Sequence, residues 1–113
     1  MDEDADEVLA LLEDEYARAI LAELTTEPMS VSELCAVCDM SDPTAYRRLE
    51  RLEAADLVTD QQVVDADGNH FKRYAATVED VTVTFDDGTY EVSVTRSSTD
   101  PSDRFTDLFE GLT

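Results

Sequence analysis

The chain has 113 residues, of which 28 are acidic and 8 are basic, and its formal net charge is −20. An apolar content of 42% is enough for one hydrophobic core, and the length is typical of one domain. No run of 18 apolar residues is present, which excludes a transmembrane helix and predicts no membrane partner. Taken alone, the negative charge argues against nucleic acid as a partner, because a polyanion repels a polyanion.

The start of the sequence and its cysteine content predict a cytoplasmic location. Residues 1–4 are Met-Asp-Glu-Asp, the opposite of the cationic start of a signal peptide. Two cysteines are too few for a disulfide framework, which favours a reducing compartment.

The acidic residues extend from Asp2 to Glu110 and alternate with periodic apolar positions. A disordered tail acting as a decoy or chaperone would instead gather its charge in one block. The chain also has a single lysine, Lys72, beside seven arginines. We interpret the acidity as the solvation of a folded halophilic protein rather than as a functional element.

An amphipathic helix is predicted over residues 6–24, because apolar residues recur there at steps of three and four. Asp and Glu fill its first turn, which complements the helix dipole. The sequence Thr-Thr-Glu-Pro at 25–28 ends it. The apolar stripe consists of Leu9, Leu12, Tyr16, Ile20 and Leu24.

Two short helices follow. Ser30 and Glu33 have the spacing of a capping box, which opens the first of them. Ser41 is the expected N-cap of the second, where Pro43 is tolerated only in the first turn. This second helix is expected to run to about Ala55, with an apolar stripe made of Ala45, Leu49 and Leu52.

Two β-hairpins and a last helix complete the prediction. The first hairpin covers residues 57–76 and has an Asp-Gly-Asn tip. In the second, Asp87-Gly88 as the turn places six apolar residues on one side, in the pairs Phe85–Tyr90, Val83–Val92 and Val81–Val94. Asp100-Pro101 opens a short helix with a stripe of Phe105, Leu108, Phe109 and Leu112.

This order of elements predicts an α+β fold: a winged helix-turn-helix with an extra β-hairpin and a C-terminal helix. Residues 1–78 are expected to form the DNA-binding domain with its N-terminal helix. Residues 79–113 would add the hairpin and the last helix to the same domain and to a dimer interface. The apolar stripes of the terminal helices favour a two-fold interface, although the last helix could instead fold back on its own core.

The positions of the rare cations support this assignment. Residues 41–74 hold five of the eight basic residues and have a net charge of −2, whereas the other 79 residues have −18. At about 100° per residue, Arg47 and Arg51 point away from the apolar stripe, toward phosphates or guanine edges. Arg48 leans toward the core boundary, where it would meet a phosphate or an acid of another element. The candidate DNA-binding residues are Pro43, Thr44, Tyr46, Arg47, Arg48, Arg51, His70, Lys72 and Arg73.

Two of these positions allow a second interpretation. His70, on the wing, either touches the minor groove or is only a polar residue at a hairpin tip. Asp42, close to the expected DNA contact, either stabilises the helix N-terminus or accepts a hydrogen bond from cytosine N4.

The segment SVSELCAVCDMSDPTAYRRLERLEAADLV resembles the ArsR-like winged-helix transcription regulators of haloarchaea. Their pattern combines a Ser-rich turn, an Arg-bearing recognition helix, an exit similar to LxxxGLV and a wing. The resemblance covers residues 10–76, and Asp56 stands where glycine is typical. It implies a homodimer that binds pseudo-palindromic promoter DNA.

Cys35 and Cys38 form a C-x-x-C pair with three interpretations. Metal-sensing members of the ArsR family bind thiophilic metals or arsenite through a similar stretch, and a thiol pair can also respond to oxidants. The helix-turn-helix pattern itself places small core residues at these positions. A zinc site would need two further ligands, and His70 is the only histidine, so we expect no metal and no cofactor.

The inventory of chemical motifs predicts no enzyme, because a phosphate-binding glycine loop and a Ser/His/Asp or Cys/His arrangement are both lacking. Two functions therefore compete. A transcription regulator that binds double-stranded DNA needs an outward arginine face beside the wing cations. A winged-helix module that contacts a protein of the transcription machinery would show an exposed apolar patch there instead. The sequence identifies no small-molecule effector.

Overall fold

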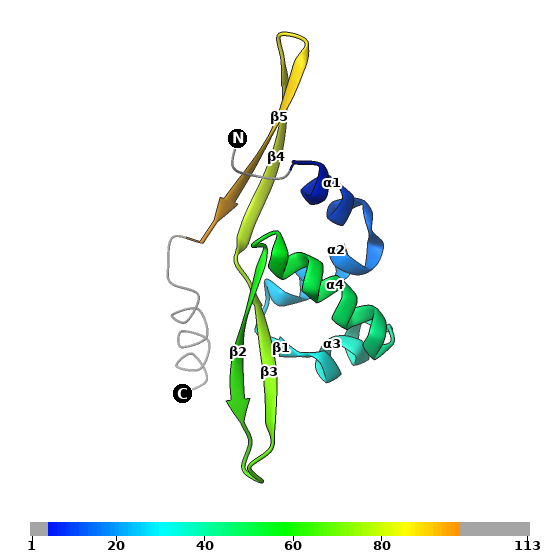
Figure 1. Ribbon diagram of the computed structural model, residues 1–113, viewed down its shortest axis with the longest axis vertical. Helices are drawn as coiled ribbons and strands as arrows, with labels where there is room; N and C mark the ends of the chain where they lie inside the picture. Colours follow the sequence, from blue (N-terminus) through cyan, green and yellow to red (C-terminus); the bar gives the residue numbers. More distant parts are fainter. Residues whose placement is uncertain (1–4, 98–113) are drawn as a thin grey trace.

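The computed structural model describes residues 5–97, which form four helices and five strands (Figure 1). The helices are α1 (Ala5–Glu13), α2 (Glu15–Leu24), α3 (Val31–Cys38) and α4 (Asp42–Ala54). The strands are β1 (Met29–Ser30), β2 (Val58–Val64), β3 (His70–Ala76), β4 (Val78–Asp86) and β5 (Thr89–Arg96). The predicted C-terminal helix after Asp100 lies outside the described residues.

The strands form two antiparallel sheets, one with the order β1-β3-β2 and one made of β4 and β5 alone. With helices α2 to α4 packed against the first sheet, this is the predicted α+β winged helix-turn-helix with an extra hairpin. Strands β2 and β3 are the wing, and the hairpin β4–β5 extends beyond the helices at the opposite end (Figure 1). No helix among residues 5–97 is long and apolar enough to cross a membrane.

The single helix predicted over residues 6–24 is wrong, because the chain breaks at Asp14. Asp14 has extended backbone angles (φ −77°, ψ 121°), and its carboxylate accepts a hydrogen bond from Ala17 N at 2.9 Å, so it is the N-cap of α2. The Arg18 guanidinium donates to the carbonyl oxygens of Leu12 and Glu13 at 2.7 and 2.9 Å. These bonds satisfy carbonyls that the end of α1 leaves without helical partners. Periodicity did not reveal the break, because the apolar spacing continues through it.

The helix-turn-helix has the predicted caps. The Ser30 hydroxyl accepts from Glu33 N, and the Glu33 carboxylate accepts from Ser30 N, which confirms the capping box of α3. Ser41 caps α4 through Thr44 N, and Pro43 lies in the first turn. These local interactions fix where α4 begins and therefore which of its side chains face outward.

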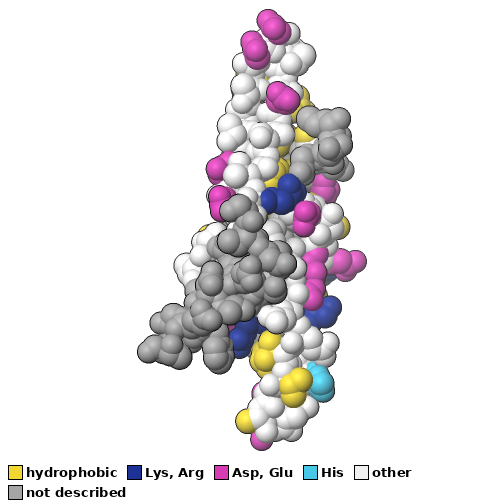
Figure 2. Space-filling view, turned by 90° about the vertical axis from the view of Figure 1, so that its left-hand side faces the viewer, with side chains coloured by type: hydrophobic (Ala, Val, Ile, Leu, Met, Phe, Trp, Pro, Cys, Tyr) yellow, Lys and Arg dark blue, Asp and Glu magenta, His cyan; other side chains and the backbone are white. Residues whose placement is uncertain are grey.

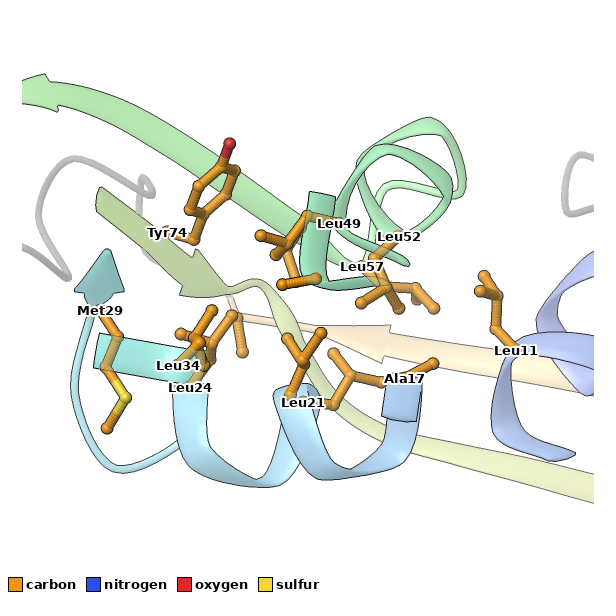
Figure 3. Close-up of a cluster of buried hydrophobic side chains, with 14 of the residues drawn as sticks. Leu11, Ala17, Leu21, Leu24, Met29, Leu34, Leu49, Leu52, Leu57 and Tyr74 are labelled. Atoms are coloured by element: carbon orange, nitrogen blue, oxygen red, sulfur yellow. The ribbon is translucent and has the colours of Figure 1, made fainter. Parts of the chain in front are cut away.

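Apolar side chains of α2, α3 and α4 meet the inner face of the first sheet and form one core (Figure 3). The largest fully buried side chains belong to this layer and to α1: Val8, Leu11, Ile20, Leu24, Leu34, Leu49, Leu52 and Leu57. Tyr74 of β3 closes the core on the wing side, with its ring buried and its hydroxyl directed away from the cluster (Figure 3). The core thus fixes α4 against the base of the wing.

The second hairpin has the predicted register, with Phe85 opposite Tyr90, Val83 opposite Val92 and Val81 opposite Val94. Its base is continuous with the core, because Val78 belongs to the buried cluster and Val81 and Val94 pack against it. The backbone bonds from Thr77 N to Leu57 O and from Ser97 N to Thr77 O hold this base in place.

Candidate nucleic-acid interface

Helix α4 presents its N-terminal half to solvent. Ala45, Leu49 and Leu52 are fully buried, as the apolar stripe predicts. Of the residues between them, Tyr46, Arg47 and Glu50 are exposed, with 56% of Tyr46 accessible, whereas Arg48 and Arg51 are half-buried. Pro43 is exposed and Thr44 is half-buried, with its hydroxyl accepting a hydrogen bond from Ser41 at 3.0 Å. This end of the helix can approach base edges, as in other helix-turn-helix proteins.

The three arginines of α4 do not share one environment. Arg47 is exposed and makes no ion pair with any residue from 5 to 97. Arg48 pairs with Asp14 at 3.0 Å and lies 5.5 Å from the centre of the Tyr16 ring. Its Nε also donates to Asp14 at 3.1 Å, and this hydrogen bond holds the pKa of the Asp14 carboxyl below its usual range. Of the two predicted partners for Arg48, the structure therefore shows an acid on another element.

Arg51 is also directed toward the N-terminal helices. Its Nε donates to the Glu7 carboxylate at 3.1 Å, and both side chains remain partly exposed. Acids of the N-terminal region thus neutralise two of the three arginines of α4. Sequence reasoning missed Glu7 and Asp14 as partners, because 44 and 34 residues separate them from Arg51 and Arg48.

The wing divides its cations between two faces. Side chains alternate along a strand, so His70 and Lys72 share the side of the core residue Tyr74, whereas Arg73 points to the opposite side. The Arg73 guanidinium lies over the Phe71 ring at 5.8 Å, and its Nε is buried without a hydrogen-bond partner among the described residues. Arg73 is paired with Ser30 on one side and Gln61 on the other, so it lies well inside the sheet.

A groove of about 870 Å³ separates α4 from the wing. From the candidate set, Tyr46, His70 and Lys72 line it, so the structure brings these three residues together. Four acids also line it: Asp42, Glu50, Glu53 and Asp65. The side of α4 that faces the wing is therefore acidic, a feature that the sequence analysis missed because it had not placed the wing relative to the helix.

Glu53 and Asp60 form a carboxyl pair between α4 and β2. Burial and the hydrogen bond with Asp60 raise the pKa of Glu53 to about 7. Lys72 Nζ lies 4.0 Å from the Asp60 carboxylate and is the nearby cation. At neutral pH the Glu53 carboxyl is therefore protonated for part of the time.

The two cysteines pack against the core from α3 and are half-buried. Burial, followed by a hydrogen bond to the Asp42 carboxylate, raises the pKa of the Cys35 thiol to about 11. Burial also raises the pKa of Cys38. A protonated thiol is a weak nucleophile and a weak metal ligand, so these observations favour core packing over the redox and metal interpretations. Within residues 5–97, no three His, Cys, Asp or Glu side chains are grouped to hold a metal ion.

Comparison with known proteins agrees with this geometry. Residues 12–61, from the end of α1 into the first strand of the wing, match a family described as a helix-turn-helix domain. The match shows that this segment is similar to helix-turn-helix domains. A search of curated proteins gave no match to the chain.

Proposed function

From the winged helix-turn-helix fold and its family match, we propose a sequence-specific transcription regulator of a halophilic archaeon that binds promoter DNA. The recognition segment 42–55 enters the major groove, and the wing 58–76 lies beside it on the backbone. The observation that carries this proposal is Arg47, which is exposed on the outward side of α4 and has no acidic partner among residues 5–97.

The ion pairs divide the candidate residues into two roles. Arg47, with Thr44 and Tyr46 one turn or less away, is placed to contact bases and phosphates. Arg48 and Arg51 position α4, since their pairs with Asp14 and Glu7 join the recognition helix to α2 and α1. Lys72 and His70, on the groove side of the wing, are the wing residues on the same surface as α4.

The regulator acts as a homodimer in this proposal. One recognition helix and a few cations form only a small contact with DNA. Two copies related by a two-fold axis double the contact area when they bind the two halves of a pseudo-palindromic site. The base of β4–β5 is continuous with the core, which supports our assignment of this hairpin to the same domain as the winged helix-turn-helix. Light scattering in molar KCl tests the dimer, which a monomeric mass with DNA binding retained would contradict.

The Arg47→Ala variant tests the DNA contact. Fragments of genomic DNA are selected with the wild-type protein in molar KCl, and the affinity of both proteins for one selected fragment is then measured. We expect a loss of at least tenfold, since a specific arginine contact contributes about 1–3 kcal/mol. Thr84→Asp is the matched control, because it changes the net charge by the same amount on the exposed hairpin and should leave affinity unchanged.

Two results would contradict the proposal. One is an Arg47→Ala protein that binds the selected fragment as tightly as the wild type. The other is a wild-type protein that binds no genomic fragment more tightly than it binds nonspecific DNA.

A second candidate is a winged-helix module that binds a basic segment of a transcription protein. The acidic lining of the groove favours it, together with the exposed ring of Tyr46. Glu50→Gln separates the two functions, because Glu50 is exposed on the groove side of α4. A DNA reader gains affinity for DNA when this negative charge is removed, whereas a module for basic partners gains none and binds a lysine- and arginine-rich peptide more weakly.

A further inference from the structure

Helix α4 carries two arginines that acids hold in different ways. Arg48 is bound through two nitrogens, because its Nε and one terminal nitrogen lie 3.1 and 3.0 Å from the same carboxylate oxygen of Asp14. Arg51 is bound through Nε alone, which lies 3.1 Å from the Glu7 carboxylate. The terminal nitrogens of Arg51 make no hydrogen bond with any residue from 5 to 97. Since a guanidinium has five N–H donors, Arg51 keeps four of them available for a ligand.

The exposure of the two ion pairs differs in the same sense. The side chains of Arg51 and Glu7 are 42% and 37% exposed, whereas those of Arg48 and Asp14 are 23% and 20% exposed. The Arg48 guanidinium also lies 5.5 Å from the centre of the Tyr16 ring. Arg48 is therefore enclosed by its partners, while Arg51 is held on the side of α1 and remains accessible to solvent.

Arg51 also lies on the side of α4 that we propose for DNA. It comes four residues after the exposed Arg47, so the two side chains are neighbours on one helix face, about 6 Å apart along the axis. In helix-turn-helix complexes, the N-terminal residues of the recognition helix contact bases, and residues further along can contact the backbone. A phosphate is the ligand expected at Arg51, because it accepts two parallel hydrogen bonds from a guanidinium.

We propose that Arg51 contacts a DNA phosphate through its terminal nitrogens, and that Glu7 of α1 is the positioning residue that holds the guanidinium for this contact. The inference rests on the proposed DNA-binding function and adds helix α1 to it. Glu7 acts through Arg51 and does not touch DNA. A free arginine side chain has many rotamers, and the bond from Nε to Glu7 restricts them before DNA arrives, so less conformational entropy is lost on binding.

The negative charge of Glu7 opposes this role mainly at low salt. A carboxylate near a phosphate repels it, but the Debye length falls from about 10 Å at 0.1 M salt to about 3 Å at 1 M. The hydrogen bond that orients Arg51 is a direct contact at 3.1 Å, and an uncharged acceptor can also make it. Orientation therefore outweighs repulsion in molar KCl, which gives the effect of Glu7 a defined sign.

Substitutions of Glu7 test the positioning role in molar KCl, with a genomic fragment selected by the wild type. Glu7→Ala removes the acceptor and should weaken binding about threefold. Glu7→Gln keeps an amide oxygen for the Nε–H of Arg51 and should bind at least as tightly as the wild type. Asp6→Ala is the matched control, because it removes the same charge from an exposed position in the first turn of α1. In an Arg51→Ala background, Glu7→Ala should have no effect, because the two residues act as one unit.

The salt dependence of affinity tests the phosphate contact separately. The loss of one phosphate contact lowers the slope of log K against log [KCl] by about 1. We expect this change for Arg51→Gln. Arg48→Gln is the control, because it removes the same charge from the same helix at an enclosed position, and it should keep the wild-type slope. Urea denaturation checks that each variant is folded.

Nitrogen relaxation of the arginine Nε groups follows the positioning without DNA. Arg51 Nε should be ordered in the wild type and in Glu7→Gln, and mobile in Glu7→Ala. A Glu7→Ala protein with equal or higher affinity for DNA would overturn the proposal, and so would an unchanged salt slope in Arg51→Gln. If Arg47→Ala still loses affinity, either result leaves the DNA-binding function standing. A wild-type protein that selects no DNA fragment would contradict both.

Discussion

At the scale of single residues, Asp56 shows how a departure from a family pattern has a structural cost. It follows the C-cap of α4 with φ 59°, in the left-handed region, and its neighbour Leu57 N bonds back to Leu52 O at 2.9 Å. This is the arrangement in which glycine is favoured after a helix, since an L side chain is strained there. The regulators that this segment resembles have glycine at this position, and the positive φ of Asp56 explains why glycine is favoured there.

Asp56→Gly should raise the free energy of unfolding by about 0.5–1 kcal/mol, because it relieves this strain. The lost ion pair with Arg96, at 3.3 Å, offsets little of the gain, since the Asp56 side chain is 76% exposed. The Asp56 carbonyl, which accepts from Arg96 Nε at 2.8 Å, is kept. Urea denaturation measures the change. Ala54→Gly, inside the last turn of α4, is the control and should lower stability instead.

Glu53 predicts a dependence of stability on pH. Its pKa in the folded protein is raised from the ordinary value of 4.5 to about 7, so the folded state binds the proton more tightly than the unfolded state does. This contribution to stability is fully present below pH ~4.5 and is lost as the pH rises through about 7. Glu53→Gln should flatten this part of the urea-midpoint profile and be more stable than the wild type at pH 8.

Glu50→Gln is the control for that experiment, because Glu50 lies on the same helix and is exposed. It should keep the fall in stability between pH 4.5 and 7. A Glu53→Gln protein with the wild-type slope would show that another group causes the pH dependence.

At the scale of elements, helix α4 is held by its N-terminal cap and by two of its arginines. The Ser41 cap sets its start, and the pairs Arg48–Asp14 and Arg51–Glu7 join it to the N-terminal helices. Asp14 has two roles, because it also caps α2. The break between α1 and α2 is thus where the chain supplies a carboxylate to Arg48 of α4.

Asp14→Ala should lower the free energy of unfolding by about 2 kcal/mol, because it removes a cap and leaves the partly buried Arg48 without its carboxylate. Asp14→Asn keeps a capping oxygen and removes the charge, so we expect about half of that loss. Glu13→Ala, on the exposed end of α1, is the control for urea denaturation. Equal losses in the two Asp14 variants would show that the cap contributes nothing.

At the scale of the whole molecule, the charge distribution differs from a simple basic face on an acidic body. Two of the five cations between residues 41 and 74 are paired with N-terminal acids, and Arg73 lies on the far side of the wing. Figure 2 shows acidic side chains spread from the tip of the extra hairpin to the body, with the single histidine at the opposite end, on the wing. If the protein binds DNA in molar salt, as we propose, counterion release would add little to the affinity, and direct contacts and shape would have to supply it.

The molecule is elongated, with extents of 57 × 30 × 20 Å, because the wing and the extra hairpin extend from opposite ends of the helical body (Figure 1). The acidic groove between α4 and the wing is a consequence of this packing. Because acids line this groove, residues 41–74 do not form the one uniform surface for DNA that the sequence suggests.

Within residues 5–97, the sequence by itself determined the class of fold and the elements, apart from the break at Asp14 and the short strand β1. Helix caps, apolar periods and the register of the second hairpin depend on residues a few positions apart, so the sequence contains them directly. Only the tertiary structure decided which cations are paired, which faces of the wing they occupy and that Glu53 meets Asp60. These relations join residues from different elements, and the packing of helices on the sheet, which no local pattern encodes, fixes their distances.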